Sequence, residues 1–262
     1  MSVGAWSIFW NEIQKELAKT TRVVTYDRAG YGWSDASPFP RTAKEIAEEL
    51  HVLLHKANIL PPYVPVGHSF GGHTIRVFAD LYPEEVVGIV LVESAHERQW
   101  QVLPPAVNML VEKALSDLKG ASKLSRTGQM KLEEIEPSSS LPDGLQAAYK
   151  ATIIQPKYHQ AFYGEMAVLD LTSRQVAATK PLGNMPLAVV TAENSFGQFA
   201  GIPNFPIEEC NQKWMELQSE LTNLSSNSKL FLSKEATHKI QIDDPKIIIE
   251  AVSYVISSVR GN

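Results

Sequence analysis

A serine between two glycines stands in the segment Gly67-His68-Ser69-Phe70-Gly71. Residues 63–66 (YVPV) before it favour a short strand, and residues 72–81 after it have a helical pattern. A serine on a sharp turn between a strand and a helix is typical of a nucleophile elbow, whose glycines leave room for strained backbone. The helix that follows turns the positive end of its dipole towards developing negative charge. The pentapeptide alone arises often by chance, but this context predicts a nucleophile at Ser69.

A serine hydroxyl is a poor nucleophile near neutral pH, so it needs an adjacent base that a carboxylate orients. His238 lies in the segment 235–240 (EATHKI), after the last predicted strand and before the last predicted helix. On position alone it could be that base or a loop histidine without a role. His68, the variable residue of the elbow, is expected to pack beside the site or line it.

Two glutamates are candidates for the orienting carboxylate. Glu93 ends the apolar run 86–92 (VVGIVLV), and Glu193 follows the run 187–192 (LAVVTA). No aspartate occurs between Asp170 and Asp243, so an acid after the second run would have to be Glu193. A carboxylate that ends a buried strand is costly unless it is paired, which favours Glu93 and keeps Glu193 as the alternative.

His51 and His55 lie one turn apart on a predicted helix, a spacing that suits a pair of metal ligands. No third ligand is apparent in the sequence. A solvated helix face is therefore the favoured interpretation of the pair, and the sequence implies neither a metal nor an organic cofactor.

The composition is that of an ordinary globular chain. It has 262 residues, 44% hydrophobic and 20% charged, with a formal net charge of −5, which gives no electrostatic reason to expect nucleic-acid or membrane binding. A single cysteine, Cys210, cannot form an internal disulfide, and no apolar run approaches the ~20 residues of a membrane span. No signal peptide is visible, so we expect a cytoplasmic protein. The oligomeric state stays open.

Strands are predicted to alternate with helices along most of the chain, which indicates an α/β fold with a mostly parallel sheet. Between residues 97 and 180 the pattern is helical only, broken by prolines and a serine-rich loop. The predicted helices cover 6–19, 42–57, 72–81, 106–118, 143–154, 157–169, 208–224 and 245–259, and the predicted strands cover 21–26, 63–66, 86–92, 187–192 and 229–233.

Four motifs in order resemble the α/β-hydrolase family, in its capped, esterase-like branch: DRAGYGWSD (27–35), PYVPVGHSFGG (62–72), VVGIVLVESAHE (86–97) and ATHKIQIDDP (236–245). The likeness covers about residues 3–100 and 185–260. It implies an α/β-hydrolase core over 1–96 and 181–262, and a helical cap over 97–180 that is an insertion and not an independent domain.

The resemblance also assigns roles. It implies that Ser69 is the nucleophile and His238 the base, with Glu93 as the acid, since capped members such as haloalkane dehalogenases place a carboxylate at that strand end. Dehalogenases and epoxide hydrolases carry an aspartate in the elbow, so Ser69 argues against their chemistry. The loop of Asp27 and Arg28 is expected to brace the site edge, with Tyr31 and Trp33 packed there.

An oxyanion hole needs two N–H donors. Phe70 would supply one from its backbone, and by resemblance Val3 is the nearest position for the second. Residues 1–10 (MSVGAWSIFW) resemble only the tail of the family's glycine-rich loop. By this resemblance, the strand that precedes the loop in the family, next to the elbow strand, has no counterpart here, and we expect a chain that is truncated at its N-terminus relative to the family pattern.

The resemblance implies a serine hydrolase that cleaves a carboxylic ester or a related acyl compound through an acyl-enzyme. Met109, Phe162 and Met166 are expected to line the substrate pocket together with His68; the alternative is that they form the core of the cap helices. Two other functions remain open. One is a different reaction of the same residues, as in a lyase, acyltransferase or C–C hydrolase. The other is a weakly active or non-catalytic ligand-binding protein that lacks the N-terminal oxyanion loop.

Overall fold

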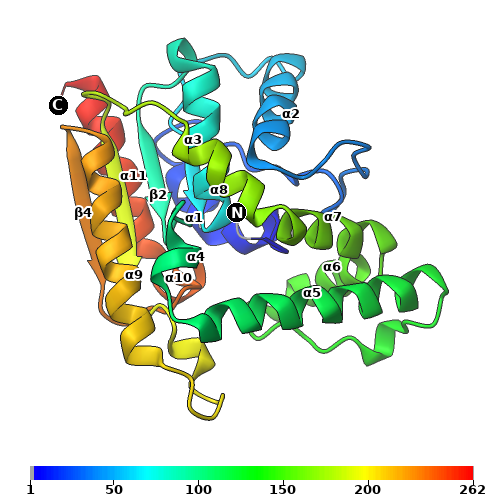
Figure 1. Ribbon diagram of the computed structural model, residues 1–262. Helices are drawn as coiled ribbons and strands as arrows, with labels where there is room; N and C mark the ends of the chain where they lie inside the picture. The colour runs from blue at the N-terminus through cyan, green and yellow to red at the C-terminus, as the bar shows by residue number, and fades with distance from the viewer. Residues whose placement is uncertain (1–2, 262) are drawn as a thin grey trace.

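The computed structural model describes residues 3–261, and within this range the strands form a single four-stranded sheet. The order is β1 (Val66–His68), β2 (Ile89–Val92), β3 (Leu187–Ala192) and β4 (Ser228–Ser233), and every neighbouring pair is parallel. The register places His68 opposite Val92, and Val92 opposite Val190. The carboxyl ends of β1, β2 and β3 therefore meet at one edge, as the α/β prediction requires (Figure 1).

Helices cover both faces of the sheet, which explains why β2 and β3 are apolar throughout. Val90 and Val190 pack on one face with α11 (Pro245–Arg260) and α1 (Asn11–Leu17). Ile89 and Val189 pack on the other face with α3 (Phe70–Leu81) and α2 (Ala43–Lys56). Every residue of β2 and β3 is buried, so alternate side chains fill two separate cores.

The remaining helices follow the sequence pattern with shifted ends. In the first half of the chain, the 3-10 turn η1 (Ser7–Trp10) precedes α1, and the 3-10 turn η2 (Pro83–Glu85) precedes β2. Towards the C-terminus, α9 (Ile207–Leu221) and the 3-10 turn η5 (Thr222–Leu224) precede β4. The short helix α10 (Ile240–Asp243) precedes α11. None of the described helices combines the length and apolar character that a membrane crossing requires.

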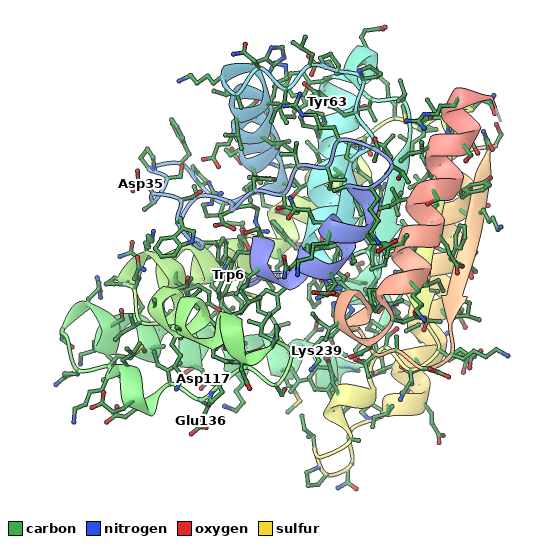
Figure 2. All side chains as sticks on the ribbon, turned by 180° about the vertical axis from the view of Figure 1, so that it is seen from behind. Trp6, Asp35, Tyr63, Asp117, Glu136 and Lys239 are labelled. Atoms are coloured by element: carbon green, nitrogen blue, oxygen red, sulfur yellow. The ribbon has the colours of Figure 1, made fainter. Side chains whose placement is uncertain are left out.

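Residues 97–180, all of them described, contain helices and no strand. The helices are α4 (Gln99–Val102), α5 (Pro105–Arg126), α6 (Asp143–Ile153), α7 (Pro156–Ala167) and α8 (Leu169–Ala177), with η3 (Leu132–Glu134) between α5 and α6. Figure 1 shows α5, α6 and α7 grouped to one side of the sheet. The N-terminal segment joins them, because Trp6 stacks on Tyr149 of α6 and meets Tyr158 of α7 edge-on (Figure 2).

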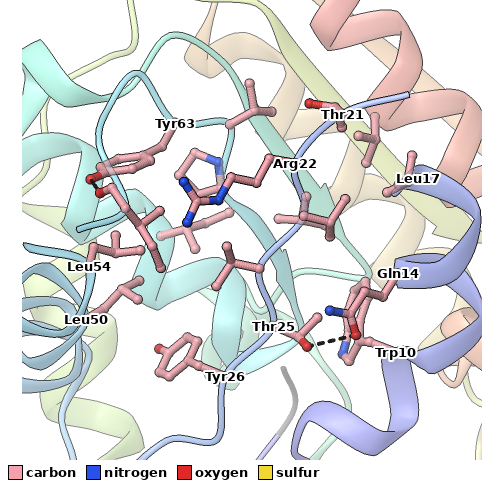
Figure 3. A pocket seen from close by; sticks show the side chains of 18 of the residues that line it. Trp10, Gln14, Leu17, Thr21, Arg22, Thr25, Tyr26, Leu50, Leu54 and Tyr63 are labelled. Atoms are coloured by element: carbon pink, nitrogen blue, oxygen red, sulfur yellow. Dashed lines mark hydrogen bonds between the residues drawn. The ribbon is translucent and has the colours of Figure 1, made fainter. Parts of the chain in front are cut away.

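The strand predicted over 21–26 does not form, and that prediction is wrong. Residues 22–28 run without a ladder partner, and β1 is the edge strand of the sheet formed by the described residues. A cavity of about 400 Å³ lies between this segment and β1; Val23, Tyr26, Val64 and Val66 are among the residues that line it (Figure 3). The β-branched run is therefore extended, but open space separates it from the backbone with which it would have to pair.

Candidate active site

Ser69 occupies the sharp turn between β1 and α3, as the motif predicts. Its backbone has φ 53° and ψ −121°, an unusual conformation for a residue other than glycine. The glycines are required by close approach: a Cβ on Gly67 would lie 2.4 Å from the carbonyl oxygen of Gly71, and one on Gly72 would lie 2.0 Å from Ser94 Oγ. The Ser69 N–H donates to the carbonyl of Val92, which ties the turn to the end of β2.

Glu93 follows β2 with a positive φ of 43°, and its side chain is completely buried. Thr191 Oγ1 and the Ala192 backbone N–H donate to Oε1 at 2.7 and 2.8 Å. The indole Nε1–H of Trp214, on α9, donates to Oε2 at 3.0 Å. These donors satisfy a carboxylate that would otherwise be expensive to bury.

His238 also contacts the Glu93 carboxylate. Its Nδ1 lies 2.9 Å from Glu93 Oε2, and its ring stands edge-on to Trp214. A carboxylate at Nδ1 holds a histidine in the tautomer that leaves Nε2 free to accept a proton.

His68 positions the loop that carries His238. Its Nε2 lies 2.7 Å from the backbone carbonyl oxygen of His238, and because a carbonyl only accepts, Nε2 carries the proton. The two rings are 4.9 Å apart. Burial lowers the pKa of His68 well below the usual histidine value, which keeps the ring neutral. Ser69 is the next residue, so the nucleophile candidate and His238 stand at the same end of the sheet.

The alternative acid, Glu193, is exposed at the end of β3 and makes no side-chain hydrogen bond with His238 among the described residues. The structure brings Glu93 to His238 and leaves Glu193 in solvent. In this conformation the Ser69 hydroxyl also makes no hydrogen bond with His238 within residues 3–261. Such contacts are often long before a substrate binds.

The oxyanion candidates differ in their surroundings. Phe70 begins α3, so its N–H has no partner within the helix and lies directly after Ser69. Val3 is half-buried, and within the described chain it makes no hydrogen bond with the elbow. Its neighbour Gly4 donates its N–H to the Tyr31 hydroxyl at 3.2 Å and lies against the Phe162 ring.

Comparison with known proteins identifies the family of this fold. A family model described as the alpha/beta hydrolase fold matches residues 3–245. The chain belongs to the α/β-hydrolase family. It is 25% identical over 249 residues to the uncharacterized protein YqjL of Bacillus subtilis strain 168, covering 95% of this chain and 78% of that protein. It is 27% identical over 279 residues to an AB hydrolase superfamily protein of Gibberella zeae, covering 98% and 84%.

Solved structures share the fold at lower identity. The lipase-named protein Lip1 of Acinetobacter baumannii AYE superposes with a TM-score of 0.71 at 19% identity, over 100% of this chain and 83% of its own. A thermophilic esterase of Thermogutta terrifontis superposes with a TM-score of 0.64 at 16% identity, over 96% and 85%. At these identities the likeness establishes the α/β-hydrolase fold and no particular substrate.

The residues predicted to line a substrate pocket lie in different places in this α/β hydrolase. Phe162 packs beside the N-terminal loop at Gly4, and Met166 is buried. Met109 is 68% exposed on α5, and His68 is buried against the His238 loop. The 400 Å³ cavity lies beyond β1, at the edge of the sheet, and does not include Ser69 or His238 among its lining residues.

The loop after residue 26 braces the N-terminal segment and the helices. Arg28 and Glu165 of α7 form a buried ion pair with two contacts of 2.8 Å, and the Tyr31 hydroxyl donates to Glu165 Oε2. Asp27 accepts the backbone N–H groups of Ser7 and Trp33. The expectation that Trp33 packs at this edge is wrong, since its side chain is 78% exposed, whereas Tyr31 is fully buried.

Sequence reasoning missed two residues of the site, Thr191 and Trp214. Thr191 lies next to the end of β3, and the parallel pairing of β2 with β3 could have indicated it, because the residue after β2 faces the end of β3. Trp214 is separated from Glu93 by 121 residues, and no local pattern marks it as a donor.

Proposed function

We propose that this α/β hydrolase is a serine hydrolase that cleaves a carboxylic ester or a related acyl compound. The observation that carries the proposal is the 2.9 Å contact between His238 Nδ1 and the buried Glu93 carboxylate, at the same sheet edge as the strained Ser69 turn. A buried acid, an imidazole and a hydroxyl on an elbow are the three groups that acyl transfer by serine requires.

In the proposed reaction Ser69 Oγ attacks the acyl carbon while His238 takes its proton. Glu93 stabilises the imidazolium that results, and the Phe70 N–H binds the oxygen that becomes negative. The leaving alcohol departs with the proton from His238. A water molecule, deprotonated by His238, then attacks the acyl-enzyme, releases the acid and regenerates Ser69.

The relatives support this class without naming a substrate. A lipase-named and an esterase structure share the fold, and structures named as an ancestral haloalkane dehalogenase and an epoxide hydrolase do so as well. Ser69 favours the ester-cleaving members, because dehalogenases and epoxide hydrolases use an aspartate at the elbow. In this proposal helices α4 to α8, within residues 97–180, form a cap over the site, and Phe162 and Met166 contribute to its acyl-binding wall.

The test is turnover of p-nitrophenyl esters of graded chain length by the purified chain and by Ser69→Ala, together with labelling by a fluorophosphonate. We expect saturable turnover and covalent labelling that both disappear in Ser69→Ala. Turnover that persists in the variant would overturn the assignment of the nucleophile.

The cavity beside β1 and the absence of a hydrogen bond between Val3 and the elbow favour a second candidate, a weakly active or ligand-binding member of the family. It predicts no labelling of Ser69 and saturable binding of an acyl compound to the folded chain. Labelling at Ser69 with slow turnover would instead indicate an activated nucleophile with an incomplete oxyanion hole, since one missing donor costs on the order of a hundredfold or more.

A further inference from the structure

Helix α2 carries two histidines that face a glutamate from another element. Nε2 of His51 lies 3.0 Å from Glu85 Oε1, and Nε2 of His55 lies 3.2 Å from the same oxygen. Glu85 ends η2, the turn before β2. The donor atoms of the three residues all lie within 4.8 Å of one another.

The sequence favours a solvated helix face for this pair; in the structure His55 is exposed, as that interpretation expects, whereas His51 is partly buried. The side chains of His51 and Glu85 are 25% and 19% exposed, and that of His55 is 49% exposed. The His51 ring stacks on Tyr82 at 3.7 Å with an interplanar angle of 3°, which fixes its orientation. Two members of the cluster are held in place, and His55 remains accessible from solvent.

The spacing suits a small transition-metal ion. Zinc binds histidine nitrogen and carboxylate oxygen at about 2.0–2.2 Å, so neighbouring ligand atoms around a tetrahedral ion lie roughly 3.4 Å apart. The two nitrogen-to-oxygen distances are 3.0 and 3.2 Å. Small side-chain rotations that move these ligand atoms apart by a few tenths of an ångström would therefore admit the ion. Two histidines one helical turn apart also chelate with little loss of chain entropy, because the helix has already fixed their spacing.

The second oxygen of Glu85 points to the same conclusion. Oε2 is buried and accepts no hydrogen bond among the described residues. A buried carboxylate oxygen without a partner is unfavourable, and a cation bound to the group would offset that penalty.

We propose that His51, His55 and Glu85 form a binding site for a divalent first-row transition metal of the zinc class, separate from the proposed active site. Two imidazole nitrogens and one carboxylate oxygen are ligands that Zn²⁺ accepts, with a fourth position open to solvent on the His55 side. A bound ion would tie the C-terminal turn of α2 to η2 and so stabilise the approach to β2.

The test is titration of the untagged, chelator-treated chain with ZnCl₂. Isothermal titration calorimetry measures the binding, and thermal unfolding at several zinc concentrations measures its effect on stability. We expect one equivalent of Zn²⁺ to bind and the unfolding temperature to rise with zinc concentration. His55→Ala, which alters a half-exposed side chain, should weaken binding at least tenfold, as should Glu85→Gln. CoCl₂ titration should give the visible absorption of a cobalt–imidazole site, and this absorption should also be lost in His55→Ala.

Glu84→Gln is the matched control, because Glu84 is the exposed neighbour of Glu85 and takes no part in the cluster. It should bind Zn²⁺ as the parent chain does, and Ser69→Ala should do the same. The proposal is overturned if the parent chain binds no Zn²⁺, if binding survives in His55→Ala, or if Glu84→Gln and Glu85→Gln weaken it equally. Because Ser69 is not a ligand of the proposed zinc site, a failure to bind Zn²⁺ would not bear on the proposed hydrolase activity.

Discussion

Trp214 donates its indole N–H to Glu93 Oε2, the same carboxylate oxygen that faces Nδ1 of His238. The indole therefore fixes the rotamer of the proposed acid. Replacing it by Trp214→Phe keeps an aromatic ring and removes the donor. Because a hydrogen bond to a charged group is worth about 1.5–3 kcal/mol, we expect kcat/KM for an ester to fall roughly tenfold or more.

Trp100→Phe is the control for this change, since the Trp100 indole N–H is buried and has no hydrogen-bond partner within the described chain. It should leave kcat/KM within about twofold of the parent by the same reasoning, as no donor to Glu93 is lost. Equal losses of activity in the two variants would show that the Trp214 hydrogen bond does not position Glu93.

The choice between the two acids is tested by Glu93→Gln and Glu193→Gln. Glu93 touches His238, whereas Glu193 is exposed. Loss of the charge at residue 93 should lower kcat by roughly 10²–10⁴-fold, because the imidazolium loses its counter-ion and the correct tautomer is no longer enforced. Glu193→Gln should be nearly neutral. A large loss in Glu193→Gln with little effect at residue 93 would reverse the assignment.

The sequence was sufficient for the parts of this site that follow from local pattern. Ser69 has glycines at fixed offsets, and Glu93 ends a run that is apolar because β2 is buried on both faces. Trp214 and Glu85 lie on elements far along the chain from their partners, so only the folded backbone reveals them. The strand prediction over 21–26 is wrong for another reason. A β-branched run indicates an extended conformation, but a strand also needs a neighbouring strand to pair with, and open space lies between this run and β1.

The open edge of β1 predicts a contrast between two adjacent amides. Val90 donates to Pro65 and Ser69 donates to Val92, so alternate residues of this segment, including Gly67, face β2. Val66 therefore directs its N–H towards the cavity, because successive residues of a parallel strand point their hydrogen-bonding groups to opposite sides. Hydrogen exchange followed by NMR should be faster at Val66 than at Gly67 by at least tenfold. Equal protection would mean that the edge is covered in solution.

The buried pair of Arg28 and Glu165 predicts a large loss of stability on Glu165→Gln. Both side chains are almost completely buried, and the change removes the negative charge that the guanidinium contacts at 2.8 Å. Removing one partner of a buried ion pair costs about 3–5 kcal/mol in the free energy of unfolding. Asp117→Asn removes an exposed pair with Lys113 on α5 and should cost no more than about 0.5 kcal/mol. Denaturant unfolding of both variants measures the contrast, and similar losses would contradict it.

His73 predicts how stability depends on pH. Its ring is buried on α3, and burial, followed by the nearby Arg76 charge, lowers its pKa from 6.5 to about 3. Between these values the unfolded chain binds a proton that the folded chain excludes, so the contribution of His73 to stability is present above pH 6.5 and is lost as the pH falls. The slope of the unfolding free energy should include about 1.4 kcal/mol per pH unit from this one group.

A neutral replacement isolates that contribution from the other acid-sensitive groups nearby. Two of these groups are Glu97 and His96. The Arg76 contact lowers the pKa of Glu97 although burial acts to raise it, and burial lowers the pKa of His96. The stability that both groups contribute is therefore also lost as the pH falls. In His73→Gln these groups remain, so the slope between pH 6 and pH 4 should decrease by about 1.4 kcal/mol per pH unit, whatever the variant's stability at neutral pH. Denaturant unfolding at several pH values gives both slopes. Parallel slopes in the two proteins would show that folding does not lower the pKa of His73, which would contradict this prediction.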